Sequence, residues 1–127
     1  MVKKVWVMLI IFVILIFGVC LEQAYIDNTY KNMEQKTISL QTSILNQDEQ
    51  KSLNNVEDID GYWNKKEIVF SLFVDYKDIE QIGRQISLIK SHINNQDFEL
   101  AMVECNLLLH ILSTYYSTIS FDWQNII

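Results

Sequence analysis

The hydrophobic pattern of the chain begins with an unbroken apolar run. Residues 5–21 contain no charged side chain, and Lys3 and Lys4 come directly before them. A helix needs about 17–25 apolar residues to cross the hydrocarbon core of a bilayer, so the run predicts a transmembrane helix. Because lysines near a span favour the cytoplasmic side, we expect residues 1–4 to be cytoplasmic. Residues 22–127 would then lie outside the cell membrane.

A cleaved signal peptide is the alternative interpretation, since it also combines a basic start with an apolar middle. Signal cleavage favours small residues in an Ala-x-Ala-like pattern. The sequence FGVCLEQAY offers only Gly18 and Cys20 at that spacing, and Phe17 and Val19 do not suit a lipoprotein signal. We therefore expect an uncleaved signal anchor that passes the membrane once.

Beyond the anchor, apolar side chains recur with the period of an α-helix in three stretches, at about 22–50, 60–94 and 97–117. The first stretch continues from the anchor and carries the stripe Tyr30, Met33, Thr37, Leu40 and Ile44. The second carries Ile68, Leu72, Ile79, Ile82, Ile86, Ile89 and Ile93. The third carries Phe98, Ala101, Met102, Cys105, Leu108, Leu109, Leu112 and Tyr116.

Short connections between helices favour antiparallel neighbours. The pattern therefore predicts an all-α fold, in which the transmembrane helix continues into an antiparallel up-down-up bundle of three extracytoplasmic helices. The scarcity of helix breakers agrees with this prediction, because the chain has no proline and three glycines.

The stretch EIVFSLFVDY, residues 67–76, is the hardest to interpret. Its composition suits a buried strand, but no glycine or proline bounds it. Its apolar part is too short for a second span. Ile68 and Leu72 are in phase with the isoleucines that follow, so we predict that the stretch lies within the second helix.

A helix through this stretch is apolar on two sides. The second side carries Trp63, Val69, Phe70, Phe73 and Tyr76. One explanation is internal packing, because each helix of a three-helix bundle touches two others and the tail SFDWQNII could fold back. The other is a partner surface formed by these five residues, since aromatic side chains are enriched at protein interfaces. The pattern leaves both explanations open.

Charge changes the picture in one respect. The net charge is −6, and from residue 22 onward eight basic residues face sixteen acidic ones, which gives −8. An acidic domain repels phosphate backbones, so we expect no nucleic-acid partner.

Reactive side chains are few and scattered. His92 and His110 lie 18 residues apart, and neither has a histidine or cysteine three or four residues away. Cys20 is at the membrane exit and Cys105 is in the third helix, so a disulfide is not expected. We find no acid–base pair, nucleophile set, metal site or cofactor motif, and expect a protein that is not an enzyme.

The sequence from GYWNKKEIVF through DYKDIEQI to the terminal NII resembles the family called domain of unknown function 4363. The family comprises small single-pass membrane proteins from clostridia and related spore-formers. The resemblance covers most of the chain and implies a membrane-anchored helical domain with a membrane-protein partner.

Two functional hypotheses follow. The first is a membrane-anchored interaction or scaffold module that self-associates or binds another membrane or envelope protein. The second is a cell-envelope sensor with an aromatic pocket formed by Trp63, Phe70, Phe73 and the C-terminal aromatic residues.

Overall fold

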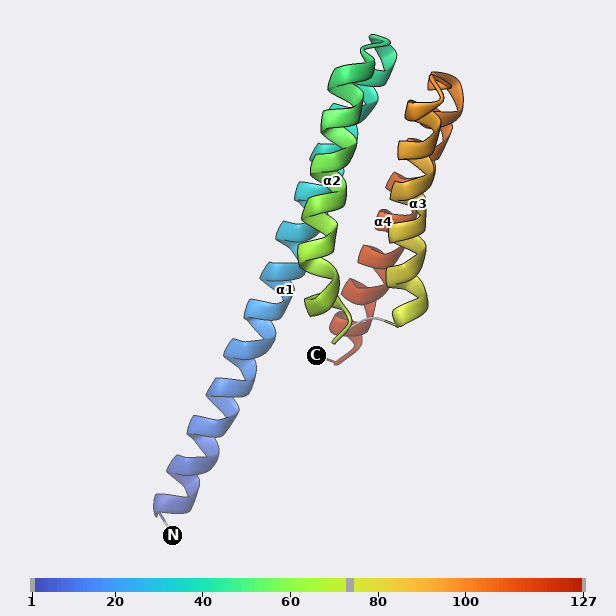
Figure 1. Cartoon of the computed structure of the whole chain (residues 1–127). Coiled ribbons are helices and arrows are strands. Elements are labelled where there is room, and N and C mark those ends of the chain that lie inside the picture. Colours follow the sequence, from blue (N-terminus) through green and yellow to red (C-terminus); the bar gives the residue numbers. More distant parts are fainter. Residues whose placement is uncertain (1, 73–74, 127) are drawn as a thin grey trace.

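The computed structural model describes residues 2–72 and 75–126, with the side chains of 118–126 left out. These residues form four helices: α1 (Val2–Leu45), α2 (Glu49–Phe70), α3 (Tyr76–Asn94) and α4 (Phe98–Ile126). Figure 1 shows successive helices running in alternating directions. No strand occurs in the described part of the chain, so the all-α prediction is confirmed. The prediction of three bundle helices is wrong, because there are four.

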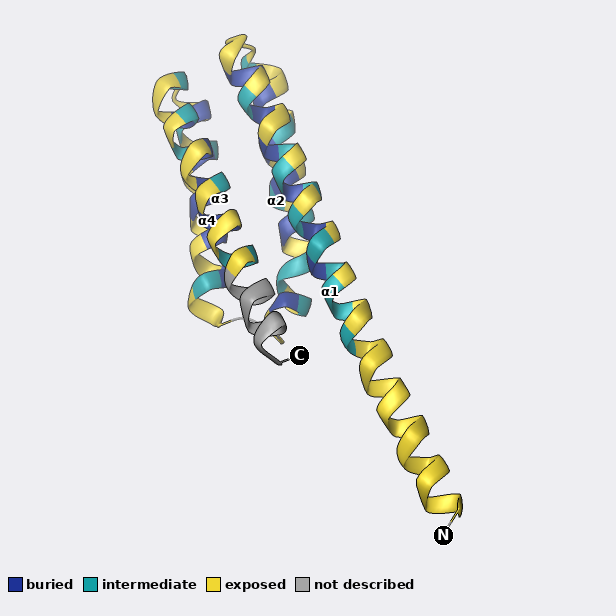
Figure 2. Ribbon diagram, turned by 180° about the vertical axis from the view of Figure 1, so that it is seen from behind, coloured by how far each residue is buried: buried dark blue, intermediate teal, exposed yellow. Residues whose placement is uncertain are grey.

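The first helix serves two environments. It spans 44 residues, about 66 Å at 1.5 Å per residue, and its first half stands clear of the other helices (Figure 2). Its second half packs along one side, where the predicted stripe is buried except for the half-buried Tyr30. The prediction that the apolar N-terminal helix continues into the bundle is therefore confirmed.

The prediction of one continuous second helix over 60–94 is wrong in two respects, its start and its continuity. A helix begins earlier, at Glu49, and stops at Phe70; another begins at Tyr76. Ile68 and Leu72 are consequently 73% and 77% exposed, outside the stripe to which the sequence assigned them. The five isoleucines of α3 in that stripe are buried, as predicted.

Local polar side chains explain the break without glycine or proline. The Ser71 hydroxyl donates to the Ile68 carbonyl at 2.5 Å, and Asp75 accepts a hydrogen bond from the Lys77 backbone N–H at 3.4 Å. Asp75 has an extended backbone and is the N-cap of α3. Serine and aspartate compete in this way for backbone groups and favour helix ends.

The two turns at the far end of the bundle have the same sequence and geometry. Both are the tripeptide Asn-Gln-Asp, at 46–48 and 95–97. The glutamine has φ of 53° in one and 59° in the other, and the aspartate accepts from the backbone N–H three residues later at 3.1 and 3.2 Å. Each aspartate N–H also bonds the carbonyl five residues earlier, at 3.1 and 2.9 Å. In each turn the glutamine, in the left-handed conformation, ends one helix, and the aspartate after it is the N-cap of the next helix.

The repeated turn marks a repeated hairpin. The tripeptides begin at residues 46 and 95, 49 residues apart. Core positions follow the same spacing. Both members of five pairs that are 49 residues apart are buried: Met33 and Ile82, Leu40 and Ile89, Ile44 and Ile93, Val56 and Cys105, and Ile59 and Leu108. The hairpins α1–α2 and α3–α4 pack together through contacts of α1 with α4 and of α2 with α3. One core therefore lies between four helices.

Candidate functional site

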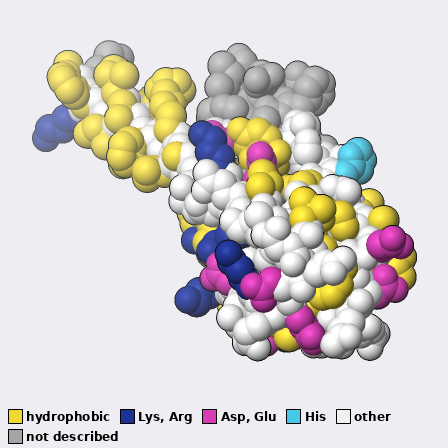
Figure 3. Space-filling model, turned by 90° about the horizontal axis from the view of Figure 1, so that it is seen from above, with side chains coloured by type: hydrophobic (Ala, Val, Ile, Leu, Met, Phe, Trp, Pro, Cys, Tyr) yellow, Lys and Arg dark blue, Asp and Glu magenta, His cyan; other side chains and the backbone are white. Residues whose placement is uncertain are grey.

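The projecting half of α1 has the surface of a membrane segment. Every large hydrophobic side chain from Val5 to Phe17 is at least half exposed. Viewed from above, this part is almost entirely hydrophobic, whereas the bundle surface mixes hydrophobic, acidic, basic and polar groups (Figure 3). Within the described residues, α1 is the one helix long and apolar enough to cross a membrane.

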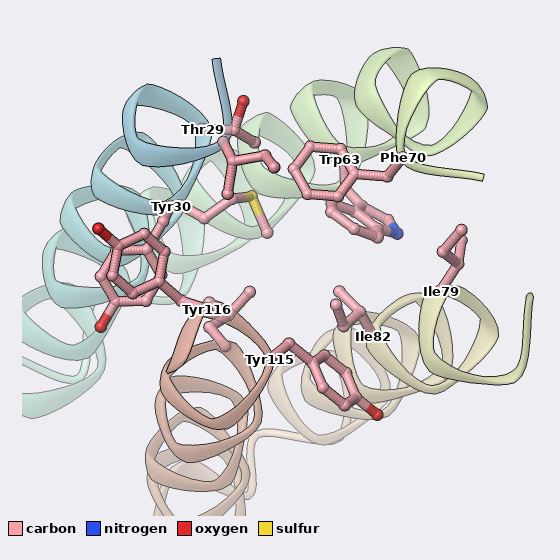
Figure 4. Close-up of a pocket in the computed structure, with 11 residues that line it drawn as sticks. Thr29, Tyr30, Trp63, Phe70, Ile79, Ile82, Tyr115 and Tyr116 are labelled. Atoms are coloured by element: carbon pink, nitrogen blue, oxygen red, sulfur yellow. The ribbon is translucent and has the colours of Figure 1, made fainter. Parts of the chain in front are cut away.

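Aromatic side chains form a cluster (Figure 4) that includes Phe70, the last residue of α2. This end of α2 faces the projecting part of α1 (Figure 1). The Trp63 and Phe70 rings are 5.7 Å apart, and Phe70 is 6.0 Å from Tyr25. The Tyr30 and Tyr116 rings stack at 4.4 Å between α1 and α4. Offset and tilted ring pairs at these distances are favourable beyond their buried area.

The cluster surrounds a cavity of about 40 Å³. Its lining comes from all four helices and consists of Ile26, Thr29, Tyr30, Met33, Trp63, Phe70, Ile79, Ile82, Leu112, Tyr115 and Tyr116. Two buried polar atoms of these residues, Thr29 Oγ1 and Trp63 Nε1, have no hydrogen-bond partner among the described residues. Buried polar groups are nearly always paired, so the two atoms are exceptions, but the surface that lines the cavity is apolar.

Burial raises the pKa of two tyrosines around this cavity. For Tyr30 the nearby Glu34 carboxylate adds to the effect of burial, and the Ser113 side chain partly opposes it. For Tyr115 the second cause is Asp78. Both phenols are therefore neutral over the physiological pH range, and each presents a hydrogen-bonding hydroxyl at the bundle edge.

The five residues of the candidate partner surface lie in different environments. Trp63 and Phe70 are 2% and 9% exposed and belong to the core. Val69 is half-buried, Tyr76 is 70% exposed, and Phe73 lies outside the described residues. The reversal between α2 and α3 thus separates residues that a continuous helix would have placed together.

Basic side chains line the outer seam between α1 and α2. Lys66 Nζ lies 4.8 Å from the Tyr25 ring centre and 5.4 Å from that of Tyr62. Lys36 forms an ion pair with Asp58 at 2.7 Å. Exposed pairs of this kind contribute little stability, about 0–1 kcal/mol, so the seam depends chiefly on its apolar contacts.

The candidate reactive residues remain apart. Cys20 is an exposed free thiol and Cys105 a buried one. His110 is exposed at a helix edge and His92 is half-buried near the end of α3. In the part of the chain that the structure describes, no three histidine, cysteine, aspartate or glutamate side chains are grouped to hold a metal ion.

Sequence reasoning missed Thr29 and Tyr115 as cavity residues. Thr29 follows the buried Ile26 by three residues and precedes Met33 by four, so its helical spacing did carry a signal. Tyr115 carried none, because its place depends on how α4 meets α3.

The family model named Domain of unknown function (DUF4363) matches residues 20–126. The chain belongs to this family, as its resemblance indicated. The match begins where the projecting segment ends, and every buried residue named for the core lies within it, from Ile26 to Leu112. The part of the chain that the family model matches therefore contains the whole described core of the bundle. No curated protein and no solved structure matches the chain.

Proposed function

We propose that the protein is a single-pass membrane protein that holds a helical interaction module at a fixed height outside the cell membrane. The proposal rests on the continuity of α1, whose first half is exposed and apolar and whose second half is part of the core. No flexible linker separates the two halves, so the bundle position follows the anchor.

The proposed orientation places Lys3 and Lys4 in the cytoplasm and the antiparallel bundle outside. A cysteine at Leu45, which is 73% exposed at the far end of α1, tests it in a Cys20→Ser background. In intact cells, a membrane-impermeant maleimide should label Leu45→Cys. Labelling that appears only after the cells are permeabilised would reverse the orientation.

The outer side of α4 supplies a candidate contact surface. Leu100, Val103 and Leu107 follow helical spacing and are 45%, 58% and 44% exposed. Apolar side chains gathered on one exposed helix face mark protein contacts more often than isolated ones do. We propose that this α4 stripe contacts a second membrane protein or a second copy of the chain.

Site-specific photocrosslinking tests the stripe. A photoreactive amino acid at Val103 should give one discrete crosslinked product in native membranes. The same group at Ser87, an exposed position on α3, is the control. Equal and diffuse products at both positions, or none at Val103, would contradict the proposal.

A sensor function is the second candidate, and the apolar cavity lined by Trp63 and its aromatic neighbours favours it. A cavity needs about 10–15 Å³ to hold one water, so the present space of about 40 Å³ takes only a small group, and its apolar lining suits an apolar one. A larger ligand requires opening. Short-chain alcohols should shift the Trp63 indole N–H resonance in a saturable way, with Trp63→Phe identifying the peak. An unchanged resonance would remove this candidate.

A further inference from the structure

The end of α2 lies close to the level at which α1 leaves the uncharged segment. The ring contact between Phe70 and Tyr25, at 6.0 Å, fixes the relative height of the two helices. Tyr25 comes four residues after Leu21, the last residue of the uncharged segment, which is about 6 Å along a helix. The last turn of α2 is therefore about one helical turn beyond the hydrocarbon boundary that the sequence predicts.

The chain beyond Phe70 approaches that boundary more closely. Leu72 is two residues farther along a descending chain, or about 3 Å, which leaves it about 3 Å from the level of Leu21. The polar headgroup layer on each side of a bilayer is roughly 5–8 Å thick. Leu72 is thus at the depth of the lipid headgroups.

Three large side chains at this turn are left uncovered by the bundle. Ile68, Leu72 and Tyr76 are 73%, 77% and 70% exposed. We call Leu72 and Tyr76 the apolar tip; Ile68 precedes Phe70 by two residues and lies about 3 Å farther from the boundary. Ile68 and Tyr76 line one groove between the ends of α2 and α3. Figure 1 shows this turn at the end of the bundle that faces the projecting part of α1.

The composition of the tip suits a lipid surface. Tyrosine is enriched at the membrane interface because its ring is apolar and its hydroxyl is polar. Aliphatic side chains beside it gain free energy by leaving water for the boundary between headgroups and acyl chains. In water the same side chains would remain exposed at both ends of the turn.

We propose that the apolar tip inserts into the headgroup layer of the bilayer that α1 crosses. The inference rests on the proposed membrane crossing of α1. A second contact beside the span limits rotation and tilt of the bundle, and so determines which side of α4 faces neighbouring proteins.

Fluorescence quenching in the full-length protein, reconstituted in phosphatidylglycerol and phosphatidylcholine vesicles, tests this proposal. An environment-sensitive fluorophore is attached to Leu72→Cys, Leu45→Cys or Ile10→Cys in a Cys20→Ser background, since Cys105 is buried. Nitroxides on the lipid headgroup or high on the acyl chain act as quenchers. Leu45 is the matched control, because it is 73% exposed at the opposite end of the bundle.

The expected result is several-fold stronger lipid quenching at position 72 than at position 45. Quenching at position 10 without any excess at position 72 would overturn the tip proposal and leave the anchor intact. Absence of quenching at position 10 would instead overturn the membrane crossing itself. A label at position 72 shielded from both lipid nitroxides and aqueous iodide would show that protein covers the tip, and would also overturn the proposal.

Discussion

For two buried threonines on α1, we expect the same substitution to change the free energy of unfolding in opposite directions. Thr29 and Thr37 are 2% and 0% exposed. The Thr37 hydroxyl donates to the Met33 carbonyl at 2.7 Å. The Thr29 hydroxyl is buried and finds no hydrogen-bond partner among the described residues. Valine has the shape of threonine without the hydroxyl, so the pair isolates the value of the hydrogen bond.

The expected magnitudes follow from the state of each hydroxyl. A buried polar group without a partner costs about 1–3 kcal/mol, and Thr29→Val removes that cost, so we expect stabilisation of about 1 kcal/mol. Thr37→Val removes a hydrogen bond whose net contribution to stability is about 1 kcal/mol. This variant should therefore be less stable by about 1 kcal/mol. The two variants should therefore differ by about 2 kcal/mol in the free energy of unfolding.

Thermal unfolding of the full-length protein in detergent, followed by circular dichroism at 222 nm, measures this difference. On the proposed membrane crossing of α1, its detergent-embedded part stays helical, so the transition reports on the bundle. For a domain of this size 1 kcal/mol corresponds to about 4–8 °C in Tm, and Thr29→Val should melt above the parent and Thr37→Val below it. Equal loss of stability in both variants would show that the Thr29 hydroxyl is satisfied, and would refute the reasoning.

Three further predictions concern stability. Ile89→Ala in the core should lower the free energy of unfolding by about 2–5 kcal/mol, whereas the same change at the 41% exposed Leu88 should cost under about 0.5 kcal/mol; similar losses in urea unfolding would contradict the assigned core. Gln47→Gly should stabilise by about 0.5–1 kcal/mol, because φ of 53° is a left-handed conformation that glycine adopts without strain; an unchanged or lower urea midpoint would argue against that conformation. Burial, aided by Glu104, raises the pKa of Cys105 from 9.0 to about 12. As pH rises, the unfolded chain therefore loses this proton before the folded one does, and the free energy of unfolding should fall above pH 9 by up to about 1.4 kcal/mol per pH unit. Cys105→Ala should show a flatter dependence on pH. The same dependence in the parent and the variant would contradict this assignment.

Periodicity alone predicted the parts of the fold in which one face of one helix meets the core. The stripe from Met33 to Ile44 and the isoleucines from Ile79 to Ile93 are buried as the 3.6-residue period requires. The projecting segment followed from length and composition, because a long uncharged run has few other structural uses. These predictions needed no knowledge of neighbouring helices.

The first half of α2 was missed because its outward side dominates its composition. The sequence NQDEQKSLNN is polar and was interpreted as a frayed end followed by a loop. The buried side chains in this half of α2 are Ser52, Val56 and Ile59, and one of these three is a small polar residue. The stronger signal was the recurrence of Asn-Gln-Asp at 46–48 and 95–97 with an aspartate able to cap each following helix.

The break at 71–75 explains why the second predicted helix was apolar on two sides. At about 100° per residue, Phe70 and Ile79 would point in opposite directions on one continuous helix. Both are buried in the same core, and a reversal of the chain between them makes this compatible. An extra apolar face therefore indicated a hidden helix–helix hairpin, in which two opposite stripes fold onto one another. Ile68 in the last turn of α2 and Leu72 just beyond it gain no place in that core. Their exposure is a direct consequence of the hairpin, which leaves them outside the packed faces of α2 and α3.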